Sequence, residues 1–472
     1  TVFTNIGSST YNLKVYNRSD NDIVIPTLRL AQGQSSNYRL NVDGMAGKEF
    51  ENIELLAKDS MFIFIETTFD IQTVVAADNQ FLYTDAIEFD TGNNLQKVEL
   101  VTLVKDAVFI YPARNSEGVI ETLTFDADGD GVDDETTLQG RFLEGSELNF
   151  TNEKPYVIYG YAAVNEGETL TIDAGARVHF HANSGLLVTN NASLKVNGAL
   201  STDPDLLENE VILEGNRLEP LYEDIPGQWG TIWLFSGSMA NEINHATIKN
   251  ATVGILAENN QNAPIDKLTI TNSQIYNSSN FGILGRATSI KAENVVINKA
   301  GQSSFAGTYG GKYNFTHCTI ANYWTNSFRQ FPALFLNNFI VDENNETFPN
   351  DLSEANFNNC IIYGNDNPEF LLEEDGGALF NFKFTNCLIR FQNNNNVATG
   401  PNYDFDNPAL YDEIILNQDP LFNDVSNNQM MICYDSPAYG EGADFMVPAD
   451  ILGTPRPSPP DLGAYQATPC ED

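Results

Sequence analysis

The chain has 472 residues, more than a single hydrophobic core usually serves, so we expect at least two folding units. It carries 64 acidic against 24 basic residues, a net charge of −40. Lys and Arg are too sparse and scattered for a polyanion-binding surface, which excludes nucleic acid and an anionic lipid surface as expected partners. No run of 18 apolar residues exists, so no membrane-spanning helix is predicted either.

The first residues, Thr1-Val2-Phe3-Thr4, carry neither the charged nor the apolar region of a signal segment. We interpret this start as the interior of an exported protein whose signal segment has been removed. Any membrane contact would then be made by a lipid anchor upstream of residue 1.

Residues 1–112 show the pattern of short hairpin strands. Tyr11–Tyr16 alternates between apolar and polar side chains, residues 19–22 form a polar turn, and Ile23–Ile25 follows. Further short apolar stretches occupy residues 61–65, 86–89 and 98–101. Strands of this length and spacing predict an immunoglobulin-like β-sandwich.

Residues 113–152 form a predicted connector with one acidic motif, Asp126-Ala127-Asp128-Gly129-Asp130-Gly131-Val132-Asp133-Asp134. Carboxylates at positions 1, 3, 5 and 9, a glycine at 6 and the carbonyl of position 7 reproduce the oxygen spacing of calcium loops. The predicted ligands are Asp126, Asp128, Asp130, Val132 and Asp134. Thr137 stands where an EF-hand has its bidentate glutamate, so a solvated acidic loop is the alternative. We expect bound calcium to stiffen this joint.

The remaining residues, 153–472, contain a four-residue phrase in six copies between His245 and Ile389: Asn or His, a small or apolar residue, any residue, then Ile. The copies begin at His245, Asn272, Asn294, His317, Asn359 and Asn386, and their second positions are 27, 22, 23, 42 and 27 residues apart. Spacings of 22–27 residues suit one coil of three short strands, and we interpret the 42-residue spacing as one coil with an insertion. The sequence therefore predicts an all-β protein whose larger part is a right-handed parallel β-helix.

The second position of the phrase holds Ala246, Ser273, Val295, Cys318, Cys360 and Cys387. We predict that these small side chains stack in one inward column, with the three cysteines buried and inert. The chain has five cysteines and no CxxC pair, which argues against a disulfide framework and a zinc site.

Asparagine is expected at the bends, because it tolerates left-handed backbone torsions and satisfies turn amides. Asn runs at residues 337–338, 358–359 and 393–396 fit this role, and His245 and His317 occupy the same slot. Alternation typical of coils is already present in Leu170–Phe180 and Gly185–Val188. The proline-rich segment Ser458–Tyr465 is expected to cap the open edge of the solenoid.

Several residues could carry chemistry. His179 and His181 share one face of a strand, but lack an evident third metal ligand. Arg217, Glu219, Glu223 and Asp224 could line a glycan-cleaving cleft, or simply close a bend. The insertion behind the 42-residue spacing contains Tyr323, Trp324 and Arg329, residue types that anchor interfaces, although core packing explains them as well.

Three stretches resemble those of Bacteroidota surface lipoproteins: Lys154–Gly160, Pro226–Trp233 and the box Asp461-Leu462-Gly463-Ala464-Tyr465. In that family an Ig-like domain precedes a right-handed β-helix ending in an Asp-x-Gly-Ala-Tyr box. The resemblance implies a lipid-anchored protein on the extracellular face of the outer membrane, in some cases a subunit of a larger assembly.

Two functional hypotheses follow. The first is a non-enzymatic scaffold or recognition subunit of an outer-membrane protein complex. The second is a carbohydrate-active β-helix enzyme (a polysaccharide lyase or glycosidase) or a glycan-binding module. An aromatic groove with carboxylates would favour the second, and a flat apolar patch the first.

Overall fold

The computed structural model describes residues 1–3, 10–70, 80–203, 206–392 and 398–470. The chain divides into two compact units, residues 1–108 with 217–223 and residues 109–216 with 224–472. Within the described ranges, no helix has both the length and the apolarity needed to cross a membrane.

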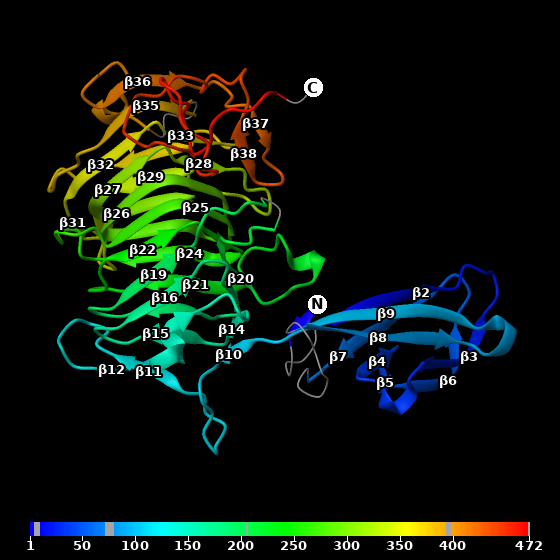
Figure 1. Ribbon diagram of the computed structural model, residues 1–472. Coiled ribbons are helices and arrows are strands. Elements are labelled where there is room, and N and C mark those ends of the chain that lie inside the picture. Colours follow the sequence, from blue (N-terminus) through cyan, green and yellow to red (C-terminus); the bar gives the residue numbers. More distant parts are fainter. Residues whose placement is uncertain (4–9, 71–79, 204–205, 393–397, 471–472) are drawn as a thin grey trace. The chain divides into compact units, whose positions relative to one another are not determined.

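The N-terminal unit is a sandwich of two β-sheets, drawn in blue in Figure 1. Side chains of alternate residues, including Leu28, Leu40 and Ile63, are buried between the sheets. The first sheet has the order β1 (Val2–Phe3), β9 (Gln96–Lys105), β8 (Gln80–Phe89), β3 (Ile23–Leu30) and β6 (Glu49–Leu55). The second has the order β2 (Tyr11–Tyr16), β7 (Ser60–Thr67), β4 (Tyr38–Val42) and β5 (Met45–Gly47).

The larger unit is a parallel β-helix whose last coil contains β36 (Figure 1), so the predicted fold class is confirmed. Each coil contributes one strand to each of three faces, here named A, B and C. Face A contains β14 (Tyr156–Ile158), β17 (Arg177–Phe180), β20 (Val211–Gly215), β23 (Ala246–Lys249), β28 (Thr319–Asn322) and β33 (Ile361–Gly364). Face B contains β15 (Tyr161–Val164), β18 (Gly185–Val188), β21 (Trp229–Leu234), β24 (Ala251–Glu258), β29 (Leu334–Asn337) and β34 (Phe370–Glu373). Face C contains β16 (Thr169–Asp173), β19 (Ser193–Asn197), β22 (Asn241–Asn244) and β32 (Leu352–Asn358).

Five strands turn from one face onto the next without a break. They are β25 (Leu268–Ser278), β26 (Phe281–Ala300), β27 (Phe305–Thr316), β35 (Lys383–Ile389) and β36 (Tyr411–Leu416).

Coil stacking begins upstream of Glu153. β10 (Val108–Ile110) pairs with β14, the end of β12 (Asp134–Phe142) pairs with β15, and β13 (Asn149–Phe150) pairs with β16. The stretch expected to be a connector therefore contains a first coil, which lacks the repeated phrase.

The predicted inward column is confirmed. The pairings place Ala246 level with Ser273, Ser273 with Val295, and Cys318 with Cys360, and the column continues to Cys387. All six column residues are buried. Small side chains are needed here because each is stacked directly against its counterparts in the coils above and below.

The predicted left-handed bends are confirmed at the phrase positions, whereas Asn337, Asn338 and Asn358, also expected at bends, do not have a left-handed φ. The first residue of every phrase, at the corner between faces C and A, has a left-handed φ between 45° and 54°. The corner side chains also bond between coils: Asn294 donates to Asn272 Oδ1 at 3.0 Å, and Asn359 Nδ2 lies 2.9 Å from His317 Nε2. Burial lowers the pKa of His317 to about 3, so its ring is neutral at neutral pH. The run at 393–396 lies outside the described residues.

The C-terminal segment lies along the outside of face A instead of capping the open edge. Gly463 N donates to Asn359 O at 2.8 Å, and Ala464 N donates to Thr319 Oγ1 at 3.1 Å. Leu462 packs in a cluster with Ile361. Gly463 has φ 84°, and a Cβ there would lie 2.7 Å from Thr319 Oγ1, so this position requires glycine.

One expectation about the cysteines is wrong, because Cys433 and Cys470 form a disulfide. The two cysteines are 37 residues apart, so no short spacing in the sequence marks them as a pair. The chain brings them together by folding back, and an isolated bridge pairs Cys433 with Thr468. Cys318, Cys360 and Cys387 are free and buried, as predicted.

We predict that Cys360→Leu lowers the free energy of unfolding of the β-helix by about 1–3 kcal/mol, because position 360 has no room for a side chain larger than cysteine between its two neighbours in the column. Cys360→Ala is expected to cost only about 1 kcal/mol. Tryptophan fluorescence during denaturation measures the free energy of unfolding of the β-helix, since Trp229, Trp233 and Trp324 all belong to that unit. Equal stabilities of the two variants would contradict the packing argument.

Candidate functional site

A β-hairpin covers the outside of face B near the start of the solenoid. It consists of β11 (Thr122–Phe125) and the first part of β12, paired antiparallel. Alternation puts Leu123 and Phe125 on the same side of β11, where both are buried in a cluster with Ala163 and Leu187 of face B. The hairpin loop, which contains the acidic motif, is thereby held against the β-helix.

The acidic loop brings three carboxylates together. Ligand atoms of Asp126, Asp128 and Asp130 all lie within 4.8 Å of one another. The loop is ordered by its own bonds: Gly129 N and Gly131 N donate to the two oxygens of Asp126 at 2.7 and 3.1 Å. Both glycines have φ near 85°, which allows the tight turn.

The remaining predicted ligands lie in the same loop. Val132 is exposed and its N–H donates to Asp130 Oδ1 at 2.8 Å. Asp134 Oδ2 accepts from Ala127 N at 3.1 Å, closing the loop at its base. Clustered hard oxygen ligands on a glycine-bent loop fit a calcium ion chemically.

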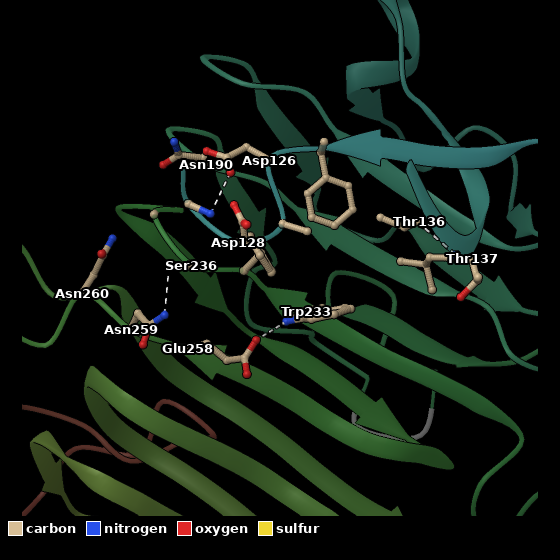
Figure 2. A pocket seen from close by; sticks show the side chains of 16 residues that line it. Asp126, Asp128, Thr136, Thr137, Asn190, Trp233, Ser236, Glu258, Asn259 and Asn260 are labelled. Atoms are coloured by element: carbon tan, nitrogen blue, oxygen red, sulfur yellow. Dashed lines mark hydrogen bonds between the residues drawn. The ribbon is translucent and has the colours of Figure 1, made fainter. Parts of the chain in front are cut away.

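A pocket of about 880 Å³ lies between this loop and face B. Figure 2 shows Asp126, Asp128 and Asn190 at one edge of the pocket, and Trp233 and Glu258 below them. The remaining wall combines aromatic, hydroxyl and amide groups contributed by Phe125, Thr136, Thr137, Phe235, Ser236, Asn259 and Asn260.

The aromatic side of the pocket is built from β21 and the residues after it. Trp233 is half-buried and makes an edge-on contact with Phe235 at 5.5 Å, and Phe235 packs edge-on against Phe125 at 5.2 Å. The turn beside them favours Gly237, because its φ is 78° and a Cβ there would also lie 1.9 Å from Asn190 Oδ1. The amide of Asn190 thus sits directly against the bend.

Glu258, at the end of β24, is the carboxylate closest to the aromatic side. Its Oε2 accepts from Trp233 Nε1 at 2.7 Å, and its Oε1 pairs with Arg286 at 3.2 Å. Beneath the pocket, the buried Lys267 donates its Nζ to the carbonyl oxygens of Phe235 and Glu258. Burial lowers the pKa of Lys267 to about 7. These bonds fix the carboxylate and the bend beside it.

The arrangement suits binding more than bond cleavage. Both oxygens of Glu258 are already engaged, one by the indole N–H of Trp233 and the other by Arg286. A glycosidase needs one carboxylic acid able to give a proton to the leaving group. The pocket can offer hydrogen-bond acceptors, amides and an aromatic surface.

The proposed cleavage cluster at residues 217–224 does not supply a free cation. Arg217 pairs with Glu219 at 3.0 Å and lies over the Tyr222 ring at 3.8 Å. The hydrogen bond to Glu219 raises the pKa of Arg217. Asp224 accepts from Asn277 at 3.2 Å, and residues 217–223 group with the N-terminal unit.

The two strand histidines have separate neighbours. His179 is buried on β17 with Nδ1 3.4 Å from Glu214. His181 stacks on Tyr159 with ring centroids 4.4 Å apart. They do not belong to the cluster of potential metal ligands found among the described residues.

The residues expected at a contact surface lie largely inside the fold. Arg329 is buried and bonds to Glu369, which is also buried. Trp324 is 7% exposed and donates Nε1 to Ser327, and Tyr323 packs edge-on against Phe422 at 6.1 Å. These aromatic and charged residues therefore anchor the insertion to the fold, while Phe328, at 85% exposed, faces solvent.

Sequence reasoning missed Trp233 and Glu258 as a pair. The phrase repeat marks the corner between faces C and A, whereas this site lies on face B, where Trp233 is level with Leu256 of the next coil. The available signal was the strand register, which would have placed Glu258 one coil along from the tryptophan-rich strand.

Comparison with protein-family models and with curated proteins gives no match. Among solved structures, the chain is similar to the catalytic unit of a thermostable GH87 alpha-1,3-glucanase from Streptomyces thermodiastaticus strain HF3-3. The identity is 11% and the TM-score 0.22, over 80% of this chain and 79% of that one. It is also similar to a GH87 alpha-1,3-glucanase catalytic-domain variant in complex with tetrasaccharides, at 11% identity and TM-score 0.21, over 80% and 81%. Likenesses this distant carry no argument about function.

We predict that the wild-type protein binds calcium and that Asp130→Ala weakens binding roughly 100-fold or more, because loss of a direct ligand should exceed the 10–100-fold typical of supporting residues. Titration calorimetry measures the affinity. Asp133→Ala is the matched control, since it removes the same charge from a loop position outside the ligand pattern. Equal binding heats for wild type, Asp130→Ala and Asp133→Ala would contradict the calcium site and identify the segment as a solvated acidic loop.

Proposed function

We propose that the β-helix is a calcium-assisted glycan-binding module and that it does not cleave its ligand. The observation that carries this proposal is the pocket on face B, where Trp233 adjoins Glu258, Asp128 and several side-chain amides. An aromatic surface beside carboxylates is the combination expected of a carbohydrate-binding site.

The chemistry of a sugar fits these groups. A pyranose has an apolar C–H face, which packs against an aromatic ring, and a rim of hydroxyls, which donate to carboxylates and exchange bonds with amides. Trp233 supplies the ring, Glu258 the fixed acceptor, and Asn259 and Asn190 the amides. The indole is held in place by its bond to Glu258, which reduces the ordering cost of binding.

Calcium would support this pocket in a specific way. Asp126 and Asp128 belong both to the acidic loop and to the pocket wall. Three carboxylates this close repel one another, and a bound calcium ion would neutralise them and hold the loop in one conformation. The wall would then be ordered before the glycan arrives.

The ligand proposed is a neutral glycan. The chain has a net charge of −40, and the pocket wall itself contributes Asp126, Asp128 and Glu258. An acidic polysaccharide would be repelled, since Arg286 is already paired with Glu258.

We predict that the calcium-loaded protein binds at least one neutral polysaccharide, and that Trp233→Ala weakens this binding roughly tenfold or more through loss of the stacking surface. Glu258→Gln should also weaken it, because a charged acceptor forms the stronger hydrogen bond. A glycan array followed by calorimetry measures both effects.

Phe328→Ala is the control, since Phe328 is an exposed aromatic residue outside the pocket. New reducing or unsaturated ends in the polysaccharide would contradict the non-catalytic proposal. Failure to bind any neutral polysaccharide would overturn the glycan proposal itself.

A second candidate function is that of a lipid-anchored subunit of an outer-membrane complex, as the family resemblance implies. The observation that favours it is a small hairpin, β30 (Phe339–Val341) with β31 (Thr347–Pro349). Ile340, Val341 and Phe348 on this hairpin are 41%, 53% and 44% exposed. Adjacent exposed apolar side chains are typical of contact surfaces.

We predict that Ile340→Ser with Phe348→Ser reduces co-purification of an outer-membrane protein from native membranes, without changing the thermal midpoint. Val119→Ser with Ile265→Ser, two exposed aliphatic residues elsewhere, should leave co-purification unchanged. An identical set of co-purifying proteins for both double variants would exclude the hairpin as the contact.

A further inference from the structure

We infer that the glycan is bound as an extended chain across several coils, with a second subsite around Tyr309. This inference rests on the proposed glycan-binding function and specifies the ligand as an oligosaccharide longer than one or two sugars.

A second pocket, of about 480 Å³, continues from the first. Asn259 and Asn260 line both pockets, so a ligand can pass from one to the other along these two side chains. The second pocket is further lined by Gln261, Ala287, Tyr309 and Asn350. All of its lining residues are neutral, which suits a neutral ligand.

The two pockets follow the stacking direction of the solenoid. Along face B, Trp233 is level with Leu256, Glu258 with Arg286, and Arg286 with Thr308, the neighbour of Tyr309. Three steps between coils, at about 4.8 Å each, give a span of roughly 14 Å from the tryptophan to the tyrosine strand. A single sugar in the first pocket does not reach that far.

Tyr309 has an unusual backbone. Its φ is 57°, in the left-handed region that a bulky residue rarely adopts, and it stands at a corner where Asn or Gly would be easier to accommodate. Strained positions of this kind are enriched at functional sites. Its N–H donates to Asn337 Oδ1 at 2.8 Å, and its carbonyl accepts from Asn350 Nδ2 at 2.8 Å.

The amides opposite the tyrosine are pre-ordered. Gln261 and Asn350 exchange two side-chain hydrogen bonds, at 3.1 and 3.0 Å, across 89 positions of sequence. The second pocket therefore combines side-chain amides with an aromatic residue, as the first pocket does, but contains no carboxylates. The corner itself requires the left-handed φ, as at Ala287 in the preceding coil, and a tyrosine at this corner adds an aromatic residue to the wall of the second pocket.

The test compares a hexasaccharide and a disaccharide of whichever neutral polysaccharide the array identifies, by calorimetry with calcium present. Wild type should bind the hexasaccharide at least tenfold more tightly than the disaccharide. Tyr309→Gly should abolish this gain and leave disaccharide binding unchanged. Because glycine tolerates φ 57°, this variant should keep or raise the thermal midpoint, so the loss would not reflect unfolding.

Glu413→Gly is the matched control. Glu413 has φ 53° at another corner of the solenoid and lines neither pocket, so this variant relieves the same kind of strain and should bind both ligands as wild type does. Equal affinities of wild type for the two ligands, or an unchanged gain in Tyr309→Gly, would overturn the extended site while leaving the glycan proposal intact. No binding of either ligand to wild type would overturn both.

Discussion

The stacking of coils in register is the constraint on which the rest of this protein depends. Each coil passes from face C to face A through one residue with a left-handed φ, and Asn or His fills that position from His245 to Asn386. The residue that follows must be small, because it faces its own counterpart in the coils on either side. Backbone hydrogen bonds between coils then satisfy the polar groups of the strands.

The same register assembles the pockets. Side chains that occupy equivalent places in successive coils become neighbours, so Trp233, Glu258 and Tyr309 align along one side of face B although they are far apart in sequence. A surface built this way repeats at the coil spacing, and it is rigid because each position is held by strands on both sides. The acidic loop is added from outside, carried by a hairpin whose Leu123 and Phe125 are buried against face B.

The solenoid also accommodates departures from its repeat. The insertion after β28 is secured by the buried pair Arg329–Glu369, whose charges are compensated by additional bonds to Ala333 N and Phe331 O. The C-terminal segment covers the outer side chains of face A, and the Cys433–Cys470 disulfide closes it. Apolar residues that point outward, such as Val296 and Ile361, are buried for this reason.

The sequence by itself determined the fold class, the inward column and the left-handed corners, because each depends on residue type at a regular spacing. It also located the acidic loop, whose geometry is local. It did not reveal the disulfide, the burial of Arg329, or the meeting of Trp233 with Glu258 and the loop at Asp128. These depend on which coils are neighbours and on where the hairpin and the C-terminal segment fold back, and only the tertiary structure decides such long-range contacts.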